Sequence, residues 1–283
     1  TEGEDLLFHT RLRAALGLSA SDYVDLDGLT PDQLSLDMFS AKELNDQGVL
    51  DYYGYDYLGN EYDGTFDEFF TSVDENGIRT FPVAPSRPIY QAAFIQDKFT
   101  FKDVIFRLGV RVDSYDANTK VLKDKYSLYE IMGAGEFDGF YDTQRPGNIG
   151  EDFKVYTGEG DDVLACRDGD DWYRANGEPV NNSTLIFSSQ VNPKYKDSRV
   201  EDIPNFIKSR DFDTSVSFED YEAQVNVMPR LAFSFPISDK ANFFAHYDVL
   251  VQRPPSNSIA SPRDYFYFTD EASVIKGNPN LKP

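Results

Sequence analysis

Apolar and polar residues alternate with a period of two along three stretches of the chain, 104–113, 225–237 and 241–252. In each stretch the positions of one parity are almost all apolar, whereas the positions between them are polar or mixed. Side chains of a β-strand point alternately to opposite faces, so the pattern predicts three strands with one apolar face. A fourth stretch, 89–99, alternates less regularly and predicts a further strand. Each stretch has about the ~9–11 residues that a tilted strand needs to cross a bilayer.

The connections between these stretches differ greatly in length. Residues 100–103 and 238–240 are short enough to be tight hairpin turns. In contrast, more than a hundred residues, at 114–224, separate the two hairpins. Short turns at one end of the strands and long excursions at the other are typical of bacterial outer-membrane barrels. Half-buried antiparallel sheets of soluble proteins also alternate, so a soluble β-rich protein remains the competing interpretation.

The expected fold class is therefore all-β with helices in the loops, as part of a transmembrane antiparallel barrel. Asp5–Leu16 has apolar residues at helical spacing, and Thr30–Gln33 has the N-cap and the proline of a helix start. The regions expected along the chain are an extracellular loop region at 1–88, a barrel hairpin at 89–115, a long extracellular loop at 116–224, a second barrel hairpin at 225–253, and an extracellular loop leading to the next strand at 254–283.

Composition restricts the function classes. The chain has 49 acidic and 27 basic residues, and a net charge of −22 repels phosphate backbones, which argues against nucleic-acid partners. Aromatic residues make up 15% of the chain, which argues against disorder. The one cysteine, Cys166, cannot form an intrachain disulfide, and His9 and His246 alone offer little for zinc binding. No apolar run approaches the ~20 residues of a transmembrane helix, so any membrane crossing must use strands.

Eight segments carry a resemblance to a known family: LSLDMFS at 34–40, YGYDY at 53–57, AFIQDKF at 93–99, LGVRVD at 108–113, DANTKVLKD at 116–124, MPRLAFSFPI at 228–237, FFAHY at 243–247 and GNPNLKP at 277–283. In this order they are similar to segments of the TonB-dependent outer-membrane receptors, and in particular to their large Bacteroidetes branch. The resemblance includes hairpins as well as loops and extends over most of the chain.

This resemblance implies a barrel of about 22 strands with an N-terminal plug in its lumen, and large extracellular loops that capture a ligand. It also implies a location in the bacterial outer membrane, contact with outer-membrane lipid, a TonB motor that acts through the plug, and a surface lipoprotein partner. The sequence contains no recognisable plug or TonB box and predicts only about four to six strands. Because the chain also begins at Thr1 without an initiator methionine and stops in a loop-like run, we expect a fragment of a longer receptor.

Polar side chains on the predicted strands are candidates for the inner face of the barrel. Pairing the second hairpin puts Arg230 opposite Asp248, and we expect these two to form a cross-strand ion pair. The same pairing puts His246 opposite Ala232. The arginines would contact plug carboxylates or an anionic solute, or would only hold the register. The lumen-facing candidates are Arg107, Arg111, Arg230, His246 and Asp248.

The loops supply two further sets of candidates. Carboxylates are preferred ligands of Ca²⁺, and the alternative for an acidic loop is that its charges are solvated. Aromatic rings can stack on sugar or peptide ligands, and the alternative is that they form cores within the long loops. The candidate Ca²⁺ ligands are Asp161, Asp162, Asp168, Asp170 and Asp171. The candidate ligand-stacking aromatics are Tyr53, Tyr55, Tyr57, Trp172, Tyr265 and Tyr267.

The sequence contains no nucleophile elbow, phosphate-binding loop, dinucleotide fingerprint or zinc-type ligand spacing, so we expect no catalytic residues and no enzyme. The leading interpretation is part of a receptor that takes up a large nutrient, such as a glycan, a peptide or a metal chelate. One alternative is a receptor-like barrel that acts as a structural or secretion-associated scaffold at the cell surface. Another is a soluble, acidic, β-rich binding module or glycosidase.

Overall fold

The computed structural model describes residues 7–45, 52–75, 77–137, 145–158, 160–187, 191–196, 203–252 and 260–267. The chain divides into two compact units. Unit 1 consists of Thr1–Val121 and Glu219–Pro283, and unit 2 consists of Leu122–Phe218. Most of the regular structure is β-strand in antiparallel sheets, with few helices, as the alternation predicts.

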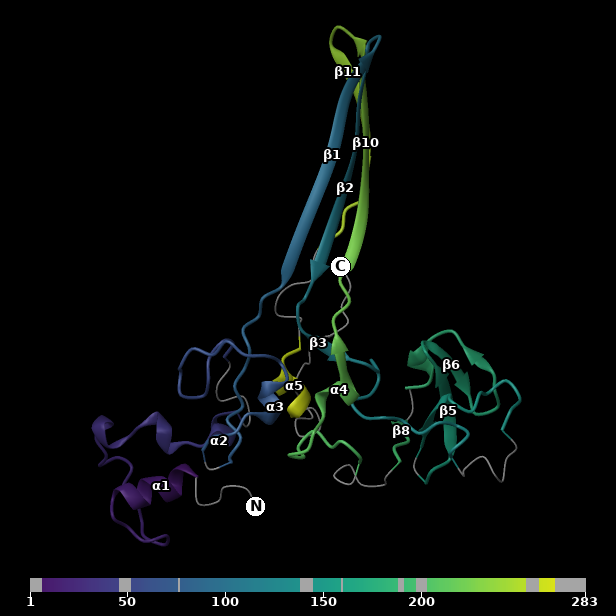
Figure 1. Cartoon of the computed structure of the whole chain (residues 1–283). Coiled ribbons are helices and arrows are strands. Elements are labelled where there is room, and N and C mark those ends of the chain that lie inside the picture. Colours follow the sequence, from purple (N-terminus) through teal and green to yellow (C-terminus); the bar gives the residue numbers. More distant parts are fainter. Residues whose placement is uncertain are drawn as a thin grey trace. The chain divides into compact units, whose positions relative to one another are not determined.

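The main sheet of unit 1 has four strands: β1 (Ile89–Phe101), β2 (Val104–Asp116), β10 (Gln224–Ser238) and β11 (Ala241–Asp248). They are hydrogen-bonded in the order β1-β2-β10-β11 and run side by side in a single layer (Figure 1). All three neighbouring pairs are antiparallel. The four predicted strands are therefore confirmed, including the less regular one at 89–99.

The two hairpin turns lie at the same end of this sheet. Lys102 and Asp103 form the first turn, where Lys102 has a φ of 54°, and Asp239 and Lys240 form the second. Because β2 runs away from the first turn and β10 runs antiparallel to it toward the second, both turns share one end (Figure 1). The connection from β2 to β10 leaves from the opposite end. The predicted contrast between short turns and a long excursion is confirmed.

One strand is shorter than the alternation predicts. The alternating stretch extends to residue 252, but β11 ends at Asp248. The N–H of Val249 still donates to the carbonyl of Pro229 across the sheet, at 3.1 Å. The reciprocal bond cannot form because proline has no N–H, so the ladder between the two strands stops here.

The rest of unit 1 contains short helices and an aromatic core. Phe69 packs against Phe81 and Phe266, with ring centroids 5.4 and 5.9 Å apart. The predicted helix near the N-terminus is confirmed as α1, and Gly17 follows it with a φ of 71°. The predicted start at Thr30 is also confirmed, since its N–H donates to the Oε1 of Gln33 at 2.8 Å. The helices are α1 (Phe8–Ala15), η2 (Pro31–Gln33), η3 (Leu36–Met38), α2 (Ala41–Asn45), α3 (Glu68–Thr71) and α5 (Pro262–Phe266).

Unit 2 has a sheet of its own, which the alternation does not predict. Its strands are β4 (Lys154–Thr157), β5 (Val163–Asp168), β6 (Asp171–Arg174), β7 (Pro179–Val180) and β8 (Asn192–Pro193), in the order β7-β6-β5-β4-β8, accompanied by η6 (Ser183–Leu185) and α4 (Thr214–Ser217). The chain passes between the units through β3 (Lys120–Leu122) and β9 (Phe218–Asp220), which pair with each other. The excursion at 116–224 therefore contains a folded unit, Leu122–Phe218.

Buried side chains form two adjoining clusters in unit 2. Val155 and Cys166 are fully buried in one of them. Tyr156 and Trp172 belong to the other, with ring centroids 4.7 Å apart. Burial raises the pKa of the Cys166 thiol to about 12, so this cysteine is an inert core residue.

Candidate functional site

The main sheet of unit 1 has one apolar face, and the register shows which residues share it. Phe99 of β1 lies opposite Phe106 of β2, which in turn lies opposite Phe233 of β10. We call this set the apolar face. Its residues are Ala93, Ile95, Phe99, Phe101, Val104, Phe106, Leu108, Val110, Val112, Val225, Val227, Pro229, Leu231, Phe233, Phe235, Ile237, Phe243, Ala245 and Tyr247.

This apolar face is open to the surroundings along its length. Ile95, Phe101 and Val227 are 71%, 64% and 60% exposed, whereas Phe69 in the aromatic core of the same unit is completely buried. In the part of the chain that the structure describes, no second layer covers the sheet. In the four strands, the register places two charged side chains on this face, Asp97 in the middle of β1 and Asp116 at the end of β2. The sheet therefore has a broad apolar surface that the described segments leave uncovered.

Aromatic rings gather on the apolar face toward the hairpin turns. The rings of Phe99 and Phe106 are stacked, with centroids 5.1 Å apart. Phe243 packs on Phe235 at 5.2 Å and on Phe233 at 6.0 Å. These cross-strand pairs stabilise the register of both hairpins.

The opposite side of the sheet, the polar face, contains all five residues that we predict to face the lumen. Its residues are Tyr90, Ala92, Phe94, Gln96, Lys98, Thr100, Ile105, Arg107, Gly109, Arg111, Asp113, Tyr115, Gln224, Asn226, Met228, Arg230, Ala232, Ser234, Pro236, Asn242, Phe244, His246 and Asp248. The predicted register is confirmed, since Arg230 lies opposite Asp248 and His246 lies opposite Ala232. The face is not uniformly polar, because Phe94 and Phe244 are also exposed on it.

The predicted ion pair between Arg230 and Asp248 does not form. Among the ion pairs of the described residues, none joins these two side chains, although their backbones are directly opposite. Register brings two residues to the same face, but the rotamers of a long arginine and a short aspartate decide whether their ends meet. The prediction was right about position and wrong about contact.

A hydrogen-bonded triad that sequence reasoning missed lies on the same face. The Nε of Arg111 is 2.6 Å from a carboxylate oxygen of Asp113, and its Nη2 donates to the hydroxyl of Tyr90 at 3.0 Å. The hydroxyl of Tyr90 in turn donates to the other oxygen of Asp113. The hairpin register places these three residues on one face, and this register could have been predicted from the sequence. The alternation at 89–99 is too irregular, however, to single out Tyr90.

Three of the predicted ligand-stacking aromatics are packing residues instead. Trp172, Tyr265 and Tyr267 are 3–4% exposed, so their rings pack mainly within their own units. Tyr53 and Tyr55 are about half-exposed. Burial raises the pKa of the partly covered Tyr57 above its ordinary value.

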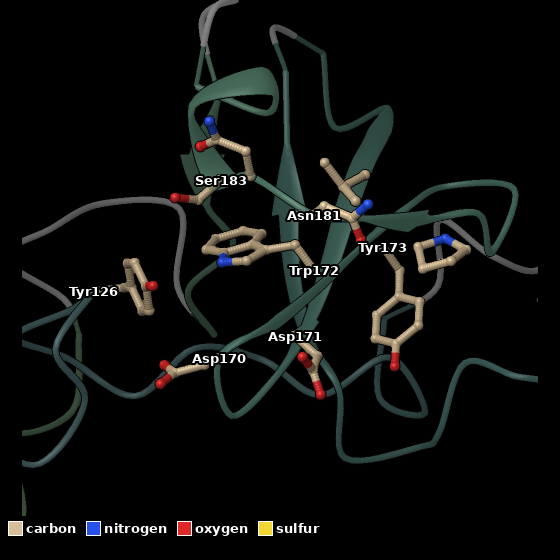
Figure 2. A pocket seen from close by; sticks show the side chains of 10 residues that line it. Tyr126, Asp170, Asp171, Trp172, Tyr173, Asn181 and Ser183 are labelled. Carbon is tan, nitrogen blue, oxygen red and sulfur yellow. The ribbon is translucent and has the colours of Figure 1, made fainter.

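Trp172 forms the inner wall of a cavity of about 550 Å³ in unit 2 (Figure 2). Tyr126 packs edge-on against the indole, with centroids 5.2 Å apart. The indole Nε1 is buried and has no hydrogen-bond partner in the described part of the chain. Asp170, Asp171 and Ser183 also line the cavity, which gives it a largely polar rim (Figure 2).

A buried cation supports this wall. The guanidinium of Arg167 pairs with the carboxylate of Asp124, and its Nε donates to the hydroxyl of Tyr156 at 3.0 Å. It also lies over the rings of Tyr126 and Trp172, 4.7 and 5.7 Å from their centroids. Despite the cation beside it, burial raises the pKa of Tyr156 to about 12. The carboxylate and the aromatic rings together compensate the desolvation of Arg167.

The five aspartates that we expect as Ca²⁺ ligands are not brought together. All five are exposed, and Asp161 and Asp170 instead form ion pairs with Lys194 and Lys125. In the described ranges, no group of three or more acidic, histidine or cysteine side chains is placed to hold a metal ion. Asp168 and Asp171 lie opposite each other at the β5–β6 turn, and both side chains are exposed.

Comparison with known protein families, with curated proteins and with solved structures finds no match to this chain. Of the helices in the described residues, none is long and apolar enough to cross a membrane.

Proposed function

We propose that the main sheet of unit 1 is a segment of a transmembrane β-barrel in a bacterial outer membrane, and that the chain is part of a TonB-dependent receptor. The observation that carries this proposal is the open apolar face on a single-layered sheet whose other face is largely polar. In the proposal the apolar face contacts lipid and the polar face lines the lumen.

The size of the apolar face supports a lipid environment over water. Four strands about 4.8 Å apart, rising about 3.3 Å per residue, present a face of roughly 800 Å². Soluble monomers rarely expose a contiguous apolar patch larger than about 300–600 Å². At about 25 cal/mol per Å², leaving half of this face in water costs on the order of 10 kcal/mol. That is comparable to the whole stability of a typical domain, about 5–15 kcal/mol.

Strand length fits a bilayer as well. β1 and β2 have 13 residues each. At about 3.3 Å per residue and a tilt of about 40°, such a strand rises roughly 30–35 Å along the membrane normal. The hydrocarbon core is about 30 Å thick. Aromatic rings near the hairpin turns would then lie toward one membrane interface, where barrels have an aromatic girdle.

The proposal requires further strands on both sides of the sheet. In the described residues, the outer edges of β1 and β11 pair with no other strand. Lipid offers no hydrogen-bond partner to a free edge, so only a closed barrel satisfies these backbone groups. We propose that the rest of the receptor supplies the missing strands and the plug, and that the hairpin turns face the periplasm.

For the receptor we propose uptake of a large nutrient, such as a glycan, a peptide or a metal chelate. This rests on the resemblance of eight segments to TonB-dependent receptors, and the TonB motor and a surface lipoprotein are the partners that it implies. The runner-up is a receptor-like barrel that serves as a scaffold at the cell surface. Transport assays on cells with and without the TonB motor separate the two, because only uptake depends on the motor.

Two neighbouring residues of β10 test the lipid contact. Leu231 lies on the apolar face in the middle of the strand, and Ala232 lies on the polar face. Arginine facing lipid near the bilayer midplane costs about 2–4 kcal/mol. We therefore expect Leu231→Arg to lower the amount of folded, membrane-inserted protein at least tenfold, and the matched control Ala232→Arg to lower it far less. Equal effects of the two variants, or a wild-type protein that stays monomeric in water without detergent, would contradict the proposal.

A further inference from the structure

Three arginines surround a glycine on the polar face of the main sheet. Arg107 and Arg111 flank Gly109 on β2, each two residues away and therefore on the same face. Arg230 of β10 lies directly opposite Gly109. Diagonal neighbours in a sheet are about 7–8 Å apart, so Arg230 is within side-chain reach of both other arginines. We call these three residues and Gly109 the arginine cluster.

The glycine leaves a hollow at the centre of this cluster. A cavity of about 120 Å³ is lined there by Phe94, Gln96, Gly109, Arg111 and Arg230, together with the backbone of their neighbours. A Cβ added at Gly109 would lie 3.2 Å from the carbonyl of Ile95 and 3.3 Å from the side chain of Gln96. Any larger residue would therefore fill the hollow or push the strands apart. At about 30 Å³ per water molecule, the hollow has room for about four waters.

The charges around the hollow are only partly balanced by the described residues. Lys98 lies directly opposite Arg107, and like charges in that position destabilise a sheet. Asp113 pairs with Arg111 and also attracts Arg230 electrostatically, and Asp248 lies directly opposite Arg230 without forming an ion pair with it. Two carboxylates therefore face four cations. In the described part of the chain, no carboxylate lies within ion-pair distance of Lys98, Arg107 or Arg230. This excess of cations is unusual in a chain whose net charge is −22.

We propose that the arginine cluster is a binding site for one oxyanion, the carboxylate or phosphate group of a small solute. Guanidinium groups bind such groups through two parallel hydrogen bonds, and Arg230 has its donors free of other partners among the described residues. Arg107 adds charge, and the amide of Gln96 adds a neutral donor at the rim. The hollow accepts one such group but is too small for a sugar ring. With the polar face as lumen lining, which rests on the proposed function, the transported nutrient is anionic.

Phosphate titration of the purified protein, with every segment it carries in the cell, tests this site. The titration uses inorganic phosphate at a constant ionic strength of about 0.15 M, because salt screens nonspecific attraction. We expect saturable binding that Arg230→Gln weakens about tenfold and that Arg230→Lys weakens less, since lysine retains the charge but loses the paired donors. Lys240→Gln, in the exposed turn at the end of the same strand, is the matched control and leaves the affinity unchanged.

Gly109→Ala supplies a second variant that leaves every charge in place. Its methyl group narrows the hollow, so phosphate binding weakens while the far-ultraviolet circular dichroism of the sheet is retained. Absence of saturable binding to the wild type, or an equal loss in Lys240→Gln, overturns the proposal. A further outcome is that the wild type does not bind phosphate and that Arg230→Gln lowers the thermal stability of the protein. In that case carboxylates of the protein itself pair with the arginines, and the proposal is overturned as well. The titration can be carried out either in detergent or in plain buffer. A negative binding result can therefore be distinguished from a failure of the protein to insert into a membrane.

Discussion

The two sheets of this protein differ in whether their apolar side chains are covered by the protein itself. In unit 2, strands of two to six residues bury Val155, Cys166 and Trp172 almost completely. In unit 1, strands of up to 15 residues leave Ile95 and Val227 more than half exposed. A short sheet can be covered by its own connections, whereas a long, single-layered one needs a partner from outside. In our proposal, lipid is this partner for the unit 1 sheet.

Truncation of one buried and one exposed ring gives the largest expected contrast. Trp172→Ala removes the centre of a packed cluster, so we expect the free energy of opening of unit 2 to fall by about 3–5 kcal/mol. Phe101→Ala on the apolar face leaves no cavity inside the protein, so the cost is below about 1 kcal/mol. Hydrogen exchange in detergent, detected by mass spectrometry, measures the free energy of opening of β5 in Trp172→Ala and of β1 in Phe101→Ala. A similar loss in both variants would mean that Phe101 is buried against protein.

The pH dependence tests the packing of unit 2, because two of its buried groups have raised pKa values. Burial raises the pKa of Cys166 from its usual 9.0 to about 12, and that of Tyr156 from 10.0 to about 12. Between about pH 9 and 12 the folded thiol keeps its proton and the unfolded thiol loses it. Unfolding is therefore favoured as pH rises, by up to about 1.4 kcal/mol per pH unit for each group.

Urea denaturation between pH 8 and 10, followed by the fluorescence of the single tryptophan, Trp172, reports on unit 2 alone. We expect the stability to decline above about pH 9, and Cys166→Ala to make that decline less steep. An unchanged slope in Cys166→Ala would mean that the thiol is accessible to water in the folded protein.

The sequence predicts the main sheet well because its information is local. A period of two, bounded by tight turns at Lys102 and Asp239, predicts both hairpins, and register then determines the face of each residue. In the second hairpin a register shift between Pro236 and Ser238 completes the pairing that centres on Asp239. This is why Arg230 is correctly placed opposite Asp248. The register does not determine side-chain rotamers. Whether Arg230 and Asp248 form an ion pair could therefore not be predicted from the alternation.

The sheet of unit 2 is not predictable in this way. Its strands are too short for a periodic signal, and three consecutive residues of β5, Ala165–Arg167, are all buried, which removes the alternation. Burial there comes from contacts between segments far apart in the sequence, as between Trp172 and Tyr126. For the same reason the packed rings of Trp172 and Tyr265 resembled ligand-stacking residues when only the sequence was considered.

The central claim is that one face of the main sheet contacts lipid and the other contacts water. Single nitroxide labels along β10, at odd and even positions from 225 to 234 in the protein reconstituted into vesicles, test it most directly. Cys166 is buried, so it contributes little background labelling. We expect labels at 225, 227, 231 and 233 to be accessible to molecular oxygen, which concentrates in lipid, and labels at 226, 232 and 234 to be accessible to a water-soluble nickel complex. Equal access of the nickel complex to both sets would contradict the account.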